Sequence, residues 1–336
     1  MRRRNVALAA VVAVGLALSA CVGGVTGGEV TILRVALNQT ETHPSYVALA
    51  NYNDRLEEQT DGRVRLDIFP NETLGAQAEV LQLLSDNIID LGIISGSQME
   101  NLSPDFLVLN MPGVFDSVEH QMPVVHDPEI VGELYTSLEG SNDITVLGGF
   151  TQGSRHIYTK DEATSLADLA GVKIRVQESE LNLAMIRVLG GSPTPMAFGE
   201  VYTALQSGVL DGAENNEVSY YTQKHYEVAP YFTNSNHLVG LDYMVASTEM
   251  LEGLDPADRQ LLEEEWVTTY QEHTQLWGEA TQEAIDGTTA GGAQFVEIDQ
   301  EEVREALLPL VDQFLTTPEQ RELYDMIRAA APEQED

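Results

Sequence analysis

The segment from Gly171 to Asn216 places the strongest constraint on the fold. Its first residues, Val172 to Val176, alternate apolar and charged side chains, which is the period of a half-buried strand. Apolar residues then recur at helical spacing up to Gly190, and a second short helix ends near Gly208 before another strand. A strand, a helical connection and a further strand indicate a parallel sheet with helices packed on it.

The N-terminal third repeats this alternation, and each element is bounded by turn residues. The predicted elements are a strand at Ile32–Leu37, a helix at Pro44–Thr60, a strand at Val64–Ile68, a helix from Gly75 to Asn87 and a strand at Ile89–Ser95. Further apolar runs predict strands at Phe106–Phe115, Ile144–Phe150 and His237–Ser247. We therefore expect an α/β fold with a mainly parallel, doubly wound sheet, in which ligands lie beyond the carboxyl ends of the strands.

A long helix is predicted in the C-terminal third. Asp255 is its N-cap, Pro256 occupies the first helical position, and no breaker follows until about Ile285. A helix of about 30 residues is roughly 45 Å long, more than the ~30 Å of a small domain. We expect it to lie across two domains. The alternative is a helix of a coiled-coil dimer, for which the sequence lacks a sustained heptad.

Composition excludes several classes of function. The 336 residues suggest about two domains, and the single cysteine allows no disulfide framework. Acidic residues outnumber basic ones 54 to 17, for a net charge of −37, so nucleic acid and anionic membranes are poor partners. An exported hydrolase would need a GxSxG elbow, an HExxH motif or a catalytic cysteine, and none is found. The seven histidines are scattered, so we expect neither a metal site nor a cofactor.

The first twenty residues read as an export signal. Three arginines precede an apolar run from Val6 to Leu18, which is too short to span a bilayer as a mature helix. Leu18-Ser19-Ala20-Cys21 fits a lipoprotein signal in which cleavage exposes Cys21 for lipid attachment. An ordinary secretory signal with a chance cysteine is the alternative. Residues 21–29 read as a flexible tether, and loss of the signal takes the net charge from −37 to −40.

Three side chains in the opening segment need an explanation. Arg175 lies on an apolar strand, Phe198 follows a proline-rich loop, and Asn215 comes just after a strand. Arg175 could be a solvated edge residue or half of a structural ion pair. It could also present its guanidinium to a ligand carboxylate with two parallel hydrogen bonds.

The segment resembles the solute-binding proteins of TRAP transporters, the tripartite ATP-independent periplasmic carriers of organic acids. The resemblance lies in KIRVQ at Lys173–Gln177, PTPMAFGEVYTALQSG at Pro193–Gly208 and LDGAENN at Leu210–Asn216. It implies that Arg175 clamps the ligand carboxylate, that Phe198 packs on the ligand and that Asn215 hydrogen-bonds it. A further arginine of the family corresponds to Arg155 in GSRHIY.

Five other residues are candidates for ligand contact. Glu41 and His43 belong to the loop after the first strand, and Gln177 ends the KIRVQ motif. Glu79 begins a helix, and Glu217, just after GAENN, would suit hydroxyls better than a second carboxylate. For His43 the alternative is a turn residue, and for Glu79 and Glu217 a solvent-exposed one.

The resemblance also implies the architecture and the partners. We expect a two-domain fold like that of periplasmic binding proteins, with a cleft between the domains and the long helix spanning both. Domain I would comprise residues 30–150 and 243–275, and domain II residues 151–242 and 276–330, with hinges at residues 151–154 and 238–242. The expected function is capture of an organic acid, namely a sugar acid such as a hexuronate, and its delivery to a TRAP membrane permease. The protein is expected to be an exported monomer that is anchored to the membrane through Cys21. The alternative ligand is a four-carbon dicarboxylate or another carboxylate. The alternative class of protein is a receptor of the ABC type.

Overall fold

The structure, a computed structural model, describes residues 30–332. The predicted signal peptide, the tether and the lipidation site at Cys21 lie outside the described residues. Within the described range, no helix combines the length and the apolar character needed to cross a membrane.

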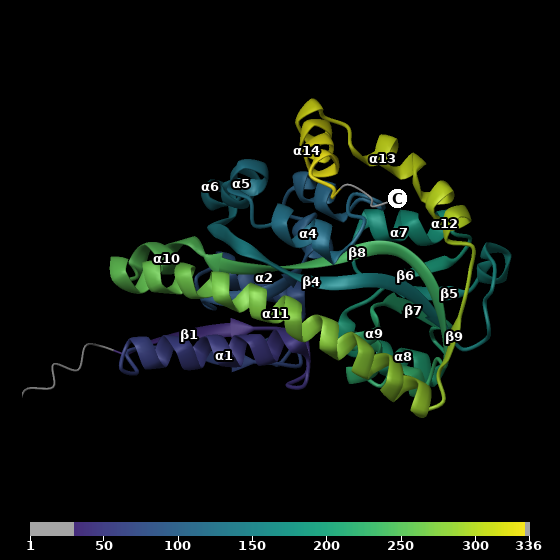
Figure 1. The fold of residues 1–336 in the computed structure, drawn as a ribbon, viewed down its shortest axis with the longest axis horizontal. Helices are drawn as coiled ribbons and strands as arrows, with labels where there is room; N and C mark the ends of the chain where they lie inside the picture. Colours follow the sequence, from purple (N-terminus) through teal and green to yellow (C-terminus); the bar gives the residue numbers. More distant parts are fainter. Residues whose placement is uncertain (1–29, 333–336) are drawn as a thin grey trace, which may run out of the picture.

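Nine strands form one mixed sheet (Figure 1). They are β1 (Thr31–Ala36), β2 (Val64–Phe69), β3 (Leu91–Ser95), β4 (Ile144–Thr159), β5 (Lys173–Val176), β6 (Ser192–Pro195), β7 (Gly212–Asn215), β8 (Tyr231–Ser247) and β9 (Gln294–Val296). The order across the sheet is β2-β1-β3-β8-β4-β7-β5-β6, and β9 pairs with β8.

Helices connect the strands and cover the sheet. The α-helices are α1 (Pro44–Gln59), α2 (Gln77–Ser85), α3 (Gly96–Met99), α4 (Val118–Val124), α5 (Pro128–Thr136), α6 (Glu139–Asn142), α7 (Glu180–Val188), α8 (Val201–Ser207), α9 (Glu217–Thr222), α10 (Thr248–Gly253), α11 (Pro256–Ala290), α12 (Gln300–Leu307), α13 (Pro309–Phe314) and α14 (Pro318–Ala329). Short 3₁₀ helices are η1 (Pro104–Asn110), η2 (Leu166–Leu169), η3 (Phe198–Glu200) and η4 (His225–Glu227).

The sheet has two parallel parts joined by an antiparallel centre. We call β2-β1-β3 the first sheet half and β7-β5-β6 the second sheet half. Strands pair in parallel within each half, whereas β8 and β4 pair antiparallel with each other and with β3 and β7. The chain therefore passes from one half to the other along two long strands (Figure 1).

The β4–β8 pair is irregular where the sequence predicted hinges. Its register shifts between Thr151 and Ser154, and β8 faces that bulge with Val239 and Leu241. Gly153 has a φ of +58°, and a Cβ there would come within 2.6 Å of Trp277 on α11. Only glycine gives the chain both this left-handed backbone and this close approach to the long helix.

Helix α11 confirms the predicted element that spans both parts of the molecule. It has 35 residues and runs along the β4–β8 pair from α1 to α9 (Figure 1). The Asp255 side chain caps the N-terminus of α11 by accepting a hydrogen bond from the N–H of Ala257 at 2.9 Å. Trp266 packs against Tyr52 of α1 and Phe150 of β4, with ring centroids 6.2 and 4.8 Å apart. The helix ends at Ala290, five residues beyond the predicted end at Ile285.

The predicted strand at Phe106–Phe115 is wrong. Residues Pro104–Asn110 form the 3₁₀ helix η1, in which the Ser103 hydroxyl accepts the N–H of Asp105 at 3.3 Å. Phe106 lies edge to face with Tyr243 of β8 at 5.4 Å, so the run packs on the sheet instead of joining it. An apolar run without a period is compatible with either state, because burial alone does not fix the backbone.

The two central strands are longer than predicted. β4 continues beyond Phe150 to Thr159, and β8 begins at Tyr231 instead of His237. The extra residues pair with each other, Thr159 lying opposite Tyr231. Each of these two strands thus continues beyond its own apolar run because it pairs with the other, which is distant in the sequence.

Candidate functional site

A narrow cavity lies between the two sheet halves, with a volume of only about 20 Å³, well below the roughly 300–1,000 Å³ usual for small-molecule sites. Its lining is mostly polar and comes from segments far apart in the sequence: Asn38, Glu72, Ala76, Gln77, Gln98, Arg175, Gln177, Glu178, Met196, Ala197 and Phe198.

The sheet topology explains why these segments meet. Asn38 follows β1, Glu72 follows β2 and Gln98 follows β3, so each lies beyond the carboxyl end of a strand in the first half. Gln177 and Met196 follow β5 and β6 in the second half. In parallel sheets these carboxyl ends share one edge, where backbone groups and loop side chains can surround a ligand.

Arg175 is the cation of this cavity, and it is 3% exposed. Its Nε donates to the Met196 carbonyl at 2.9 Å, and its guanidinium carbon lies 5.6 Å from the centre of the Phe198 ring. Within residues 30–332 it forms no ion pair with a carboxylate, and no hydrogen bond from Nη1 or Nη2 is found. Burial lowers the pKa of Arg175, an effect that Glu214 opposes. The side chain therefore offers a desolvated positive charge with two directed donors to an anionic ligand.

Arg155 is arranged differently, because the protein itself uses its donors. It pairs in two-point fashion with Glu214, Nε to Oε2 at 2.7 Å and Nη2 to Oε1 at 2.8 Å. Nη2 also donates to the Glu214 carbonyl, and Nη1 donates to Gln152 and to Asn215 Oδ1. All five N–H groups of the guanidinium thus have acceptors within the chain, and Arg155 does not line the cavity.

Asn215 is oriented by this network. Its Oδ1 accepts from Arg155 at 3.0 Å and from the backbone N–H and side chain of Asn216 at 2.9 and 3.1 Å. The Asn215 amide nitrogen thereby points away from these donors. Asn215 is 3% exposed and is not among the residues that line the cavity.

Phe198 and Gln177 lie at the cavity, as the resemblance implied for Phe198. Gln177 also links the two halves, since its Oε1 accepts from the hydroxyl of Ser95 at 2.8 Å. Similar links join Asn182 to Ser97 at 2.9 Å and the Asn101 side chain to the Glu178 carbonyl at 2.9 Å. The two halves are therefore held together beside the cavity, as in a closed cleft.

The remaining candidates do not line the cavity. His43 caps α1, where Nδ1 accepts from Ser45, and its ring is 5.6 Å from Trp277. Burial lowers the pKa of His43 to about 3, and its buried Nε2 has no hydrogen-bond partner within the described residues.

Three acidic candidates have partners within the protein. Glu41 accepts from the Asn71 side chain at 3.1 Å. Glu79 is exposed and caps its own helix at the N–H of Ala76, which favours the alternative of a solvent-exposed helix residue. Glu217 lies 3.4 Å from His156 Nε2. Ligand contact by each of these residues stays a prediction.

Sequence reasoning missed the cavity residues Asn38, Glu72, Gln77 and Gln98. The signal was present, because the carboxyl-end rule applies to the loops after β2 and β3 as it does to the loop after β1. The sequence does not show which residue of each loop turns inward.

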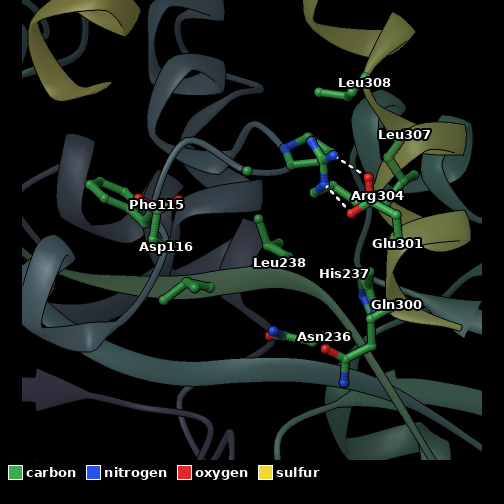
Figure 2. Close-up of a pocket in the computed structure, with 13 residues that line it drawn as sticks. Phe115, Asp116, Asn236, His237, Leu238, Gln300, Glu301, Arg304, Leu307 and Leu308 are labelled. Carbon is green, nitrogen blue, oxygen red and sulfur yellow. Dashed lines mark hydrogen bonds and ion pairs between the residues drawn. The ribbon is translucent and has the colours of Figure 1, made fainter. Parts of the chain in front are cut away.

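A second cavity, of about 280 Å³, lies between α12, the Asn236–Val239 segment of β8 and the loop from Pro112 to Asp116 (Figure 2). Its single arginine, Arg304, pairs with Glu301 on the same helix. None of the candidate residues lines it, so it lacks the unpaired guanidinium that distinguishes the cavity at Arg175.

Comparisons with known proteins agree with this geometry. The family described as bacterial extracellular solute-binding protein, family 7, matches residues 35–317. A curated solute-binding protein of Chromohalobacter salexigens is 32% identical over 276 residues, which are 82% of this chain and 82% of that protein.

Two solved structures are similar over nearly their whole length. A TRAP periplasmic solute-binding protein of Anaerococcus prevotii with bound D-glucuronate has a TM-score of 0.86 and 34% identity, covering 89% of this chain and 98% of that one. One from Xanthobacter autotrophicus with bound β-D-galacturonate has a TM-score of 0.84 and 28% identity, covering 88% and 99%.

Proposed function

Because this chain belongs to the bacterial extracellular solute-binding proteins, family 7, the receptors of TRAP transporters, we propose that it captures a sugar acid such as a hexuronate and delivers it to a TRAP membrane permease. One observation carries the proposal: a buried arginine without a carboxylate partner among the described residues faces a polar cavity between the two sheet halves. The protein would act as a binder and leave its ligand chemically unchanged.

The proposed binding mode follows from the donors at the cavity. Arg175 takes the ligand carboxylate with Nη1 and Nη2, and Phe198 packs on the ligand body beneath the guanidinium. The amides of Asn38, Gln98 and Gln177 supply donors and acceptors for hydroxyl groups, whereas that of Gln77 already bonds the Ile93 carbonyl and the Ser95 N–H. Arg155 acts as a positioning residue that orients Asn215, whose amide N–H₂ would reach the ligand only if the ligand extends beyond the residues that line the cavity. Ligand contacts by His43, Glu41, Glu79 and Glu217 are secondary parts of the proposal.

Domain closure completes the mechanism. We assign residues 30–150 and 243–275 to one domain and 151–242 and 276–330 to the other, with motion about the irregular part of the β4–β8 pair. The hydrogen bond between Ser95 and Gln177 forms only when the halves approach. Closure would exclude water from the ligand and form the surface that the permease recognises.

A ligand screen tests the proposal. Thermal shift against hexuronates, other sugar acids, four-carbon dicarboxylates and neutral sugars should give the largest stabilisation with a sugar acid, and calorimetry should then give its affinity. Chromatography of the recovered ligand should show that it is unchanged. Stabilisation by neutral sugars but by no carboxylate would contradict the clamp at Arg175, and preference for a four-carbon dicarboxylate would favour the alternative ligand.

Lipid anchoring at Cys21 is a separate part of the proposal, supported by the signal motif in the sequence. Mass spectrometry of the protein isolated from membranes should find a diacylglycerol on Cys21. The Cys21→Ala variant should be released in soluble form, and release of the wild type in the same way would contradict the anchor.

A further inference from the structure

Glu72 occupies an unusual backbone position at the mouth of the cavity. Asn71 and Glu72 follow β2 and have φ values of +59° and +55°, a left-handed conformation that residues other than glycine seldom adopt. The loop is held in place, because the N–H of Asn71 donates to the Gln39 carbonyl at 3.0 Å and that of Glu72 to the Leu37 carbonyl at 3.2 Å. Such strain persists only where the surroundings enforce it, and it is concentrated at functional sites.

The strained turn brings the Glu72 carboxylate against the second sheet half. Its Oε2 accepts the N–H of Gly199 at 3.1 Å, and a Cβ at Gly199 would come within 2.6 Å of that oxygen. A side chain at residue 199 would therefore displace this oxygen from its present position. Glu72 thus links the loop after β2 to the segment that carries Phe198.

The charges around the cavity leave a second ligand carboxylate without a partner. Arg175 is the single cation of the lining, whereas Glu72 and the exposed Glu178 are both acidic. Burial raises the pKa of Glu72, and the N–H of Gly199 and the charge of Arg175 oppose that effect. An anionic oxygen held here repels further negative charge and accepts hydrogen bonds from hydroxyl groups.

From these observations we propose that Glu72 is a specificity-determining residue that closes the cavity over acids with one carboxylate and excludes acids with two. The favoured ligand is a monocarboxylate with a neutral, hydroxylated body, and an aldaric acid with the same carbon skeleton is rejected. This inference rests on the proposed function and narrows its ligand class.

Two substitutions separate the charge of Glu72 from its contact with Gly199. Glu72→Gln keeps an oxygen that can accept the Gly199 N–H but removes the charge, whereas Glu72→Ala removes both. Glu58→Gln is the matched control, because Glu58 is exposed on α1 and its replacement changes the net charge equally. Melting curves verify that each variant is folded.

The experiment is calorimetry at pH 8 with D-glucuronate, D-gluconate and D-glucarate. Gluconate and glucarate are both open chains and differ in one terminal group, CH₂OH against carboxylate. Wild type and Glu58→Gln should bind glucarate at least about tenfold more weakly than the better of the two monocarboxylates, because its second carboxylate lies beside the like charge of Glu72. In Glu72→Gln the ratio of monocarboxylate affinity to glucarate affinity should fall about tenfold or more, because the variant gains affinity for glucarate. Glu72→Ala should also weaken the monocarboxylates, because the contact with Gly199 is lost.

An unchanged ratio in Glu72→Gln, with glucuronate still bound, would overturn this inference and leave the proposed function intact. Equal affinity of the wild type for glucarate and for the better of the two monocarboxylates would do the same. A folded wild type that binds none of the three acids would overturn the proposed function and this inference with it.

Discussion

Arg155 and Glu214 form a buried two-point ion pair between β4 and β7, with Nε–Oε2 and Nη2–Oε1 distances of 2.7 and 2.8 Å and side chains 2% and 4% exposed. Arg175, two strands away from β4, is equally buried but has no such partner among residues 30–332. The two arginines therefore differ in their partners. Arg155 forms an ion pair that joins β4 to β7, whereas the Nη1 and Nη2 groups of Arg175 remain available to a ligand.

Replacement of Arg175 should weaken binding of the proposed acid. Arg175→Lys keeps the charge but loses the second directed bond, and Arg175→Ala leaves the ligand carboxylate desolvated without a partner. The loss of a charge-assisted bond costs about 1.5–3 kcal/mol and the breaking of a buried pair about 3–5, which is roughly tenfold to a few thousand-fold in affinity. Calorimetry on folded variants measures the effect. If Arg175→Ala kept the wild-type affinity, the carboxylate clamp would lie elsewhere.

Replacement of Arg155 should act on stability first. Arg155→Met leaves Glu214 buried without its partner and should reduce the free energy of unfolding by about 3–5 kcal/mol. The double variant Arg155→Met/Glu214→Leu should recover much of that loss, because it removes both charges together. Urea unfolding of the two variants provides the comparison. A single variant as stable as the wild type would show that the pair contributes nothing to the fold.

The Glu214 carboxyl should make stability fall in acid. Its burial, the largest single effect, favours the neutral form, but the charges and contacts of Arg155 and His237 together outweigh burial and hold the pKa well below the ordinary 4.5. A lowered carboxyl pKa gives stability that is present above about pH 4.5 and is lost as pH falls below it, because the folded protein must then accept a proton it disfavours. Unfolding curves between pH 6 and pH 3 should show this loss. In the double variant Arg155→Met/Glu214→Leu the slope should be smaller.

Glu100 should have the opposite dependence on pH. It lies at the end of α3 and accepts hydrogen bonds from Ser179 and from Asn110, and burial raises its pKa to about 7. Between pH 4.5 and about 7 the folded protein keeps a proton that the unfolded chain releases, so stability falls as pH rises through that interval, by up to about 3 kcal/mol. Glu100→Gln should therefore be more stable than the wild type at pH 8 and similar at pH 5. Equal curves at both pH values would indicate an unshifted carboxyl.

Ligand should compact the molecule if the two halves close on it. The register shifts between Thr151 and Ser154 mark where the central strands can bend, and the Ser95–Gln177 hydrogen bond marks the closed state. Small-angle scattering should give a smaller radius of gyration with a saturating sugar acid than without it. An unchanged radius at saturation would indicate that the cavity is already closed in the free protein.

The acidic surface should make stability depend on salt. The chain has a net charge of −37, and the Debye length is already ~8 Å at 0.15 M ionic strength, so further salt relieves mainly short-range repulsion. The melting temperature should rise as NaCl increases from low to molar concentration. A flat or falling curve would assign the acidic residues to solubility alone.

The local pattern determined most elements of the fold, whereas the choice of Arg175 as the ligand's arginine came from the resemblance to a family. Alternation around Arg175, the caps of α11 and the turn glycines are properties of neighbouring residues, so the sequence alone predicted an α/β fold with a long helix across it. It predicted a mainly parallel sheet and missed the antiparallel pairing of β4 and β8 at its centre. The rule that ligands lie beyond the carboxyl ends of parallel strands was applied to the loop after the first strand only, although the loops after β2 and β3 also line the cavity.

Tertiary structure decided which side chains share a cavity and which arginine is free. Glu214 comes 59 positions after Arg155, and nothing in the local pattern shows that β4 and β7 pair and bring the two charges together. The inward turn of Glu72 and the 3₁₀ helix at Pro104–Asn110 likewise depend on partners distant in the chain. Periodicity reports how a segment is buried, whereas hydrogen-bond and charge partners are chosen by the packing of elements far apart in the sequence.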